Sequence, residues 1–190
     1  MTAFDTAEWE HRSRQRSDMQ DHMAFLRETA AAYDQPVIAE FGTRQGNSTS
    51  CFLAAAEDAG GQVWSVDIEP PQVPGHWFQL DRWHFLQAGD TSGEAQEWLP
   101  GKLDVLFIDT SHQLDHTLAE LRMYVPRVKP GGVVLLHDTE WEQTGATPDE
   151  CRQLGEPGGT VTEALNVFSA ETGLPWVNRH GCYGIGIIRP

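Results

Sequence analysis

Acids and histidines follow two of the apolar runs in this 190-residue chain. One run ends in Asp109, and another ends in His137 and Asp138. If the two runs are neighbouring parallel strands, both carboxylates reach one divalent cation, and carboxylates are the ligands that Mg²⁺ takes from proteins. His137 as a third ligand would favour a softer ion such as Mn²⁺ or Fe²⁺. The alternative is that His137 is a buried histidine that supports the site without binding the ion.

His112 lies three residues after Asp109 and is a candidate for proton transfer. An imidazole titrates near neutral pH, so it can accept a proton from a reacting group. The alternative is a histidine at a helix start that bonds to the backbone. His116, one helical turn later, is more typical of a surface or supporting position.

A loop with two glycines, Gly42 and Gly46, follows the first apolar run, which carries Glu40 near its end. Gly42 allows a tight turn, Gly46 allows the backbone to approach a ligand closely, and Asn47 or Ser48 can cap the next helix. The glycine spacing differs from the G-x-G-x-x-G dinucleotide fingerprint. An acid before the first glycine suits a ligand with positive charge. A strand-turn-helix without a ligand is the alternative.

Two further apolar runs also end in acids. Asp67 follows the first glycine by about two dozen residues, where doubly wound nucleotide sites place a carboxylate for ribose hydroxyls. Gly89 and Asp90 end the next run. Ligands of open α/β sheets bind at the carboxyl ends of the strands, so these side chains are expected to converge on one crevice. The alternative is that both acids cap helices or turns.

The elements that position these residues alternate between strands and helices. Strands are predicted at 37–41, 63–67, 84–87, 103–109, 133–137, 176–179 and 183–189. Helices are predicted at 8–33, 47–59, 92–99, 113–125 and from a capping box at 160 to 173, with a short helical turn at 77–82 and a tight turn at 129–132. The order predicts an α/β class: a Rossmann-like, doubly wound, mostly parallel seven-stranded sheet with an antiparallel C-terminal hairpin strand.

The length of 190 residues fits a single domain. Residues 1–35 form an N-terminal helical segment, and 36–190 form the core that carries the site. The polar loop 139–159 follows the ligand-bearing end of a central strand and is a candidate lid, with an inert insertion as the alternative. The sequence does not determine the oligomeric state, and it is compatible with a homodimer.

The formal net charge of −15 argues against a nucleic-acid or anionic membrane partner. The sequence has no apolar run long enough to span a membrane and no signal-peptide pattern, which predicts a cytoplasmic protein. The three cysteines are far apart and odd in number, so neither a disulfide framework nor a Cys-x-x-Cys zinc site is predicted.

Taken in order, these motifs resemble the class I S-adenosylmethionine-dependent methyltransferases. The resemblance covers roughly residues 36–189 and rests on E-x-G-x-x-x-G, the strand-end acids and P-G-G at 130–132. F-I-D-T-S-H at 107–112 and H-D at 137–138 resemble the small metal-dependent O-methyltransferases of the macrocin and mycinamicin type. That branch commonly has Gly where Thr110 stands, and its sugar methyltransferases often have an acid where His137 stands.

The resemblance implies roles for individual residues. The methionine part of S-adenosyl-L-methionine would lie near the first strand-end loop, the ribose hydroxyls near the acid of the second strand, and the adenine near the next residues. In chain order, the implied cofactor-binding residues are Glu40, Gly42, Gly46, Ser48, Asp67, Ile68, Gly89, Asp90 and Asp109. Asp109, His137 and Asp138 would hold Mg²⁺ or Mn²⁺, and His112 would act as catalytic base.

The predicted function is divalent-metal-dependent O-methylation of a hydroxyl on a small molecule, a sugar or glycosylated natural product. One alternative is a metal-independent N- or C-methyltransferase of the same fold. Another is a non-catalytic cofactor-binding protein, although such a module would not need Asp109, His112 and Asp138 together. A nicotinamide-dependent reductase fits least because the glycine spacing is wrong.

Overall fold

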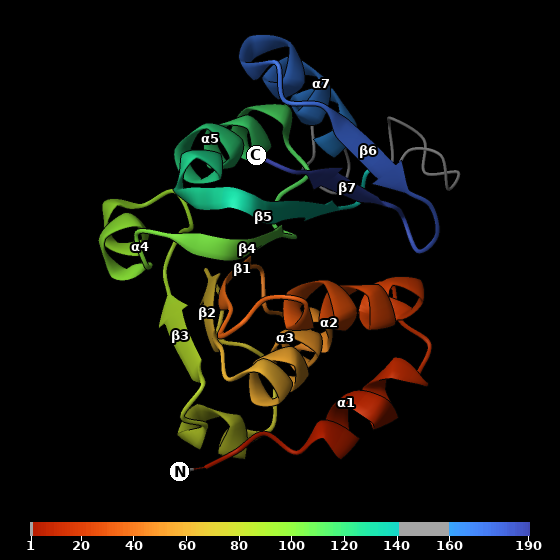
Figure 1. The fold of residues 1–190 in the computed structure, drawn as a ribbon, viewed down its shortest axis with the longest axis vertical. Coiled ribbons are helices and arrows are strands. Elements are labelled where there is room, and N and C mark those ends of the chain that lie inside the picture. Colours follow the sequence, from red (N-terminus) through yellow and green to blue (C-terminus); the bar gives the residue numbers. More distant parts are fainter. Residues whose placement is uncertain (1, 141–159) are drawn as a thin grey trace.

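The computed structural model describes residues 2–140 and 160–190 as one mixed sheet with helices on both faces (Figure 1). The strands lie in the order β3-β2-β1-β4-β5-β7-β6. Their bounds are β1 (Val37–Phe41), β2 (Gln62–Asp67), β3 (Trp83–Gln87), β4 (Leu103–Ile108), β5 (Val128–His137), β6 (Trp176–Arg179) and β7 (Ile185–Ile188). Strands β1 to β5 pair in parallel, and β7 is antiparallel to both β5 and β6. The predicted fold class is confirmed.

The α-helices are α1 (Thr6–Ser13), α2 (Met23–Ala31), α3 (Asn47–Ala59), α4 (Gly93–Trp98), α5 (Leu114–Tyr124) and α7 (Val161–Thr172). Short 3-10 helices lie at Gln20–His22, Gly75–Gln79 and Val125–Arg127. The N-cap half of the predicted capping box is present, since the Thr160 hydroxyl accepts from the Glu163 N–H at 3.2 Å. No helix among the described residues is long and apolar enough to cross a bilayer.

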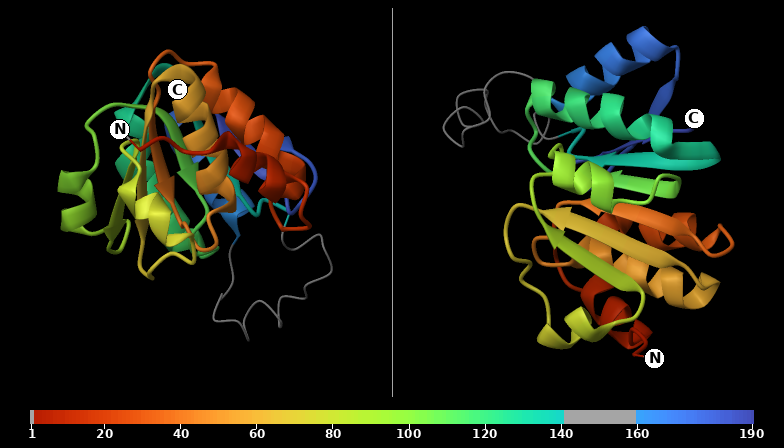
Figure 2. Two further views of the ribbon diagram at one scale, coloured as in Figure 1. Left: turned by 90° about the horizontal axis from the view of Figure 1, so that it is seen from below. Right: turned by 90° about the vertical axis from the view of Figure 1, so that its left-hand side faces the viewer.

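The helices divide between the two faces of the sheet (Figure 2). Apolar residues of α2 and α3 pack on one face, and those of α4, α5 and α7 pack on the other. All six residues of β4 are buried. The continuous apolar runs of β4 and β5 therefore reflect central strands that are covered on both faces, as expected.

The helical segment predicted at 8–33 is divided into α1, a 3-10 helix at Gln20–His22 and α2, because the chain leaves the helical path after Ser13. Arg14 caps α1, and the Ser17 hydroxyl accepts from the Met19 N–H at 3.3 Å. Short polar side chains of this kind compete with helical hydrogen bonds. Met19 is buried, so the break carries this segment against the sheet.

The predicted tight turn at 129–132 is instead a bulge within β5. Leu103 pairs with Val128 and Val105 pairs with Val133, so the Lys-Pro-Gly-Gly segment lies opposite a single residue of β4. Pro130 has no N–H to donate, and Gly131 has a φ of +82°. Both fit a bulge, where the regular hydrogen bonds between the two strands are interrupted. The predicted short turn at 77–82 begins earlier, at Gly75, and ends at Gln79.

Candidate functional site

Strands β1 to β5 are parallel, so their carboxyl ends lie at one edge of the sheet. Residues at these ends line two cavities. The His112 cavity, of about 200 Å³, is lined by residues that include Asp18, Met19, Arg44, Asn47, Ser48, Asp109, His112, Asp138 and Tyr183. The Asp67 cavity, of about 410 Å³, is lined by residues that include Arg44, Asp67, Ile68, Gly89, Asp90, Asp109 and His116. Gly42, Arg44, Asp109 and Thr110 border both. The strand-end side chains therefore converge as the sequence predicted.

Gly42 turns the chain sharply where β1 ends. Its φ is +85°, and a Cβ at this position would lie 1.9 Å from the carbonyl oxygen of Asp109. Only glycine fits both the left-handed backbone and this approach. The predicted tight turn is confirmed, and it places the loop after β1 directly against the end of β4.

Asp67 organises the loop that follows β1. Its Oδ2 accepts from the N–H groups of Thr43, at 2.8 Å, and Arg44, at 3.0 Å, while Oδ1 accepts from the Glu69 N–H at 2.9 Å. A carboxylate has about four acceptor sites, so Asp67 retains capacity toward the cavity that it lines. Arg44 is held at φ +45° within this loop.

The predicted side-chain cap of α3 is wrong. Gly46 itself is the N-cap, at φ +75°, and no side chain caps this helix end. A Cβ on Gly46 would lie 2.6 Å from Val73 and 2.8 Å from Trp77. Gly46 thus allows a close approach to other side chains, while Ser48 lies inside the helix and its hydroxyl donates to Glu40 at 2.7 Å.

Glu40 is fully buried beneath the loop and borders neither cavity. Its oxygens accept from the hydroxyls of Ser48, Thr49 and Ser65 at 2.6–2.8 Å. Burial raises the pKa of Glu40 to about 7, although the three hydroxyl hydrogen bonds oppose that rise. The described geometry gives Glu40 a supporting position below the loop.

Glu40→Gln should remove a pH dependence of stability. The folded state keeps its proton up to about pH 7, whereas the unfolded carboxyl ionises near 4.5, so wild type loses stability as pH rises through this window. The difference in unfolding free energy between wild type and variant should shift by about 3 kcal/mol from pH 4.5 to 8. Urea unfolding at both pH values, with Glu94→Gln as an exposed control, measures it. An unchanged difference would mean that Glu40 is already ionised in the folded state at low pH.

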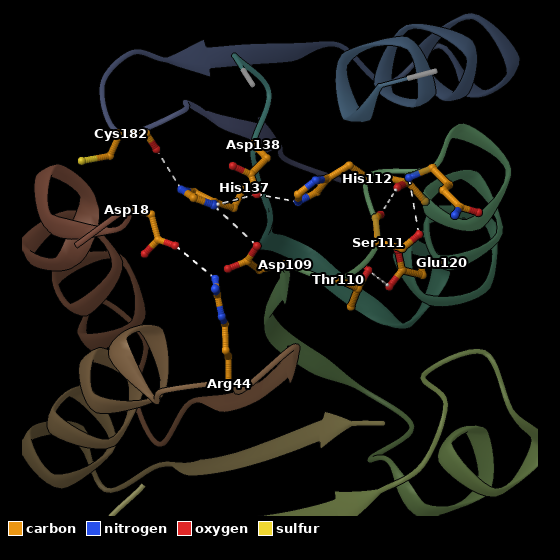
Figure 3. Close-up of polar contacts among 12 residues, drawn as sticks. Asp18, Arg44, Asp109, Thr110, Ser111, His112, Glu120, His137, Asp138 and Cys182 are labelled. Carbon is orange, nitrogen blue, oxygen red and sulfur yellow. Dashed lines mark hydrogen bonds and ion pairs between the residues drawn. The ribbon is translucent and has the colours of Figure 1, made fainter. Parts of the chain in front are cut away.

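Asp109, His137 and Asp138 form a compact cluster whose ligand atoms all lie within 4.8 Å of one another (Figure 3). His137 Nδ1 lies 3.5 Å from Asp109 Oδ1 and 3.2 Å from Asp138 Oδ2. Its Nε2 donates to the Cys182 carbonyl oxygen at 2.8 Å, which fixes the ring and directs Nδ1 toward both carboxylates. Burial alone would lower the pKa of His137, but the two carboxylates raise it to about 11. The three predicted ligands are thus brought together.

A left-handed backbone at Asp138 allows two consecutive side chains to reach this cluster. Neighbouring residues of a regular strand point to opposite faces. Asp138 has φ +65°, a conformation that costs a non-glycine residue of order 1 kcal/mol and that Asp tolerates better than most. Because the strand pattern breaks there, His137 and Asp138 share one site.

His112 reaches Asp138 from the side opposite His137 (Figure 3). Its Nε2 lies 2.7 Å from Asp138 Oδ2, and the side chain is 20% exposed on the cavity that it lines. Burial would raise the pKa of Asp138, yet hydrogen bonds from His112 and His137 hold it well below its usual range. One ionised carboxylate therefore orients both imidazoles.

Ile68, Gly89 and Asp90 border the Asp67 cavity, and Ile68 is 69% exposed there. His116, expected at the surface or in support, lines the same cavity and hydrogen-bonds to Asp90 Oδ2 at 3.2 Å. The hydrogen bond to Asp90 raises the pKa of His116, and burial opposes it.

Sequence reasoning missed three residues that border the His112 cavity: Asp18, Arg44 and Tyr183. Asp18 comes from the break between α1 and α2, and its Oδ2 lies 3.4 Å from Arg44 Nη1 (Figure 3). Tyr183 lies in a turn with positive φ from 181 to 184, for which the flanking glycines were a signal. Most of the candidate lid, residues 141–159, falls outside the described residues.

A family model described as a methyltransferase domain matches residues 39–139, which is more than half of the 190-residue chain. A curated relative, the uncharacterized protein y4gI of Sinorhizobium fredii, is 27% identical over 123 residues. That alignment covers 57% of this chain and only 14% of the relative.

Solved structures share the fold. The SAH-bound Podospora anserina methyltransferase PaMTH1 has a TM-score of 0.64 at 16% identity, covering 97% of this chain and 86% of its own. The mycinamycin-pathway methyltransferase MycE, in complex with Mg, SAH and mycinamycin VI, has a TM-score of 0.66 at 19% identity and covers 98% of this chain. This chain spans 53% of the MycE chain. The matched family model and the shared fold agree with the predicted resemblance, and the chain belongs to the methyltransferase domain family.

Proposed function

We propose that this protein is a divalent-metal-dependent O-methyltransferase that uses S-adenosylmethionine and acts on a small hydroxylated molecule, with a sugar or glycosylated natural product as the leading class. The observation that carries the proposal is the Asp109–His137–Asp138 cluster with His112 bonded to Asp138 at the wall of a cavity. A cytoplasmic location, a homodimer and a single domain over 1–190 stay predictions.

The donor set fits a divalent cation. Two carboxylates and one imidazole nitrogen converge, and a carbonyl holds the other imidazole nitrogen, as is usual for metal-binding histidines. Oxygen-rich ligand sets suit Mg²⁺ or Mn²⁺, and the imidazole shifts the preference toward Mn²⁺. A cation held there would supply Lewis acidity, which lowers the pKa of a bound hydroxyl.

The protein's own residues would bind the cofactor and move the proton. S-adenosylmethionine carries the reactive methyl group. We assign the Asp67 carboxylate to its ribose hydroxyls, and Ile68, Gly89 and Asp90 to the adenine side, because all four border the larger cavity. We assign the acceptor proton to the His112 imidazole. Because Nε2 donates to Asp138, which orients the ring, the nitrogen that accepts this proton would be Nδ1.

Cofactor binding is tested by thermal unfolding. At a hundred times its dissociation constant, S-adenosylhomocysteine should stabilise the folded state by about 2.7 kcal/mol and raise Tm by roughly 5–10 °C. NAD should not. Asp67→Ala should lose most of the shift, measured against the variant's own Tm because Asp67 also holds the loop at Thr43 and Arg44. Glu97→Ala, an exposed acid on α4, is the control. Stabilisation by NAD alone would contradict the proposal.

Two other functions remain as outcomes of these measurements. A metal-independent N- or C-methyltransferase of this fold would keep full turnover in excess chelator. A non-catalytic cofactor-binding protein would show the thermal shift but release no S-adenosylhomocysteine with any acceptor.

A further inference from the structure

A second cluster of ligand-type side chains lies outside the Asp109 group. Asp90 follows β3, and His116 and Glu120 lie one turn apart on α5. The ligand atoms of these three residues all lie within 4.8 Å of one another. The buried Tyr124 hydroxyl of α5 donates to the Asp90 carbonyl oxygen, and this hydrogen bond holds the backbone at Asp90 next to the helix.

The two clusters share one arrangement, in which an imidazole nitrogen lies between two carboxylates. In the second cluster His116 Nε2 lies 3.0 Å from Asp90 Oδ1 and 3.7 Å from Glu120 Oε1. His137 Nδ1 stands in the same relation to its two carboxylates, at 3.5 and 3.2 Å. A nitrogen in this position can hold a proton, or it can direct its lone pair at a cation shared with the carboxylates.

Glu120 supplies an independent sign of a ligand. Its side chain is 0% exposed, and Oε1 accepts from the Thr110 hydroxyl at 2.8 Å (Figure 3). Oε2 has no hydrogen-bond partner among the described residues. Burial, and next the charge of Asp90, raise the pKa of Glu120 to about 8. A buried carboxyl oxygen without a partner is costly, and a bound cation removes that cost.

The cluster is accessible from a cavity. Asp90 and His116 both line the Asp67 cavity, and the buried Glu120 lies 3.7 Å from His116 Nε2. Metal ligands must be deprotonated, so a cation entering there would replace the proton in the hydrogen bond between His116 Nε2 and Asp90 Oδ2.

We propose that Asp90, His116 and Glu120 form a second divalent-cation site beside the Asp67 cavity. One imidazole and two carboxylates favour a borderline ion such as Zn²⁺, Mn²⁺ or Co²⁺ over Ca²⁺, which takes oxygen ligands. The bound ion ties the loop after β3 to α5. The site does not depend on the proposed metal centre, because its ligands are separate from Asp109, His137 and Asp138. Asp90 alone is shared with the proposed adenine side of the Asp67 cavity.

Titration of the metal-stripped protein with Co²⁺, without cofactor, tests the proposal. Calorimetry counts equivalents, and visible absorption reports nitrogen and oxygen ligation. Wild type should bind two equivalents, and Asp109→Asn/Asp138→Asn should bind one. Glu120→Gln and His116→Gln should each lose one equivalent, and each should abolish binding when added to the double variant. Asp115→Asn, exposed on the same helix, should still bind two.

Two results would overturn the second site. In one, Asp109→Asn/Asp138→Asn binds no Co²⁺. In the other, the single equivalent of Co²⁺ that this double variant binds is retained when Glu120→Gln is added and also when His116→Gln is added. Glu120→Gln keeps the size of the side chain and the acceptor for Thr110. His116→Gln changes a side chain that is 32% exposed, so it carries the test if Glu120→Gln fails to fold. If wild type instead binds a single equivalent that survives Asp109→Asn/Asp138→Asn and is lost in Glu120→Gln, the second site stands and the metal centre of the proposed function fails.

Discussion

Excess chelator is expected to abolish methyl transfer by the purified protein, and added Mg²⁺ or Mn²⁺ to restore it. Asp109, His137 and Asp138 converge on one point, and a hydroxyl without a Lewis acid is a poor nucleophile at neutral pH. Release of S-adenosylhomocysteine, followed by mass spectrometry, measures turnover with an acceptor found by screening hydroxylated small molecules, with sugars and catechols included.

The two carboxylates should respond differently to substitution. Asp109→Asn removes a ligand, so high Mn²⁺ should restore part of its turnover. Asp138→Ala should not be rescued, because Asp138 Oδ2 also holds His112 at 2.7 Å. Asp115→Asn serves as the control. Full turnover in chelator would point to a metal-independent enzyme.

His112→Ala is expected to lower turnover by about 10²- to 10⁴-fold, the usual contribution of a positioned acid-base group. His112 borders the cavity next to the cation cluster, and its ring is oriented by an ionised carboxylate. Cofactor and cation binding should change little, because His112 is in neither proposed ligand set. Single-turnover measurement with saturating cofactor separates the chemical step from product release.

The acceptor's own acidity provides a second readout for His112. A catechol hydroxyl ionises more readily than an alcohol, so the loss in His112→Ala should be smaller for a catechol than for a sugar. His11→Ala changes an exposed histidine and should leave turnover unaltered. Near-normal turnover of His112→Ala on an alcohol would exclude it as the base.

The sequence predicted the fold because each strand has a local signal. Apolar runs ending in Asp67, Asp109 and Asp138 mark strand ends, and the ends of parallel strands meet at one edge of a sheet. The predicted bounds of helices were wrong where tertiary contacts decide where a helix ends. Met19 is buried after the break that follows α1, and the apolar spacing at 8–33 does not indicate that break.

The candidate site was predicted in part for the same reason. His112, His137 and Asp138 were found because they stand next to strand ends. The sequence did not predict that Glu40 supports the loop from below, because its three hydroxyl partners come from two other elements, α3 and β2. The pairing of Arg44 with Asp18 is also set by tertiary packing, 26 residues apart in the chain.

The fit of Gly42 against Asp109 has a thermodynamic consequence. The backbone of the loop after β1 lies against the Asp109 carbonyl with no room for a methyl group, and the Asp109 N–H donates to the Phe41 carbonyl oxygen at 2.9 Å. The loop that borders the Asp67 cavity therefore packs directly on the backbone of Asp109, whose carboxylate belongs to the Asp109–His137–Asp138 cluster. A ligand that fixes the loop is therefore expected to constrain the backbone of Asp109 as well. Where such linkage exists it is reciprocal: the factor by which a cation tightens cofactor binding equals the factor by which the cofactor tightens cation binding.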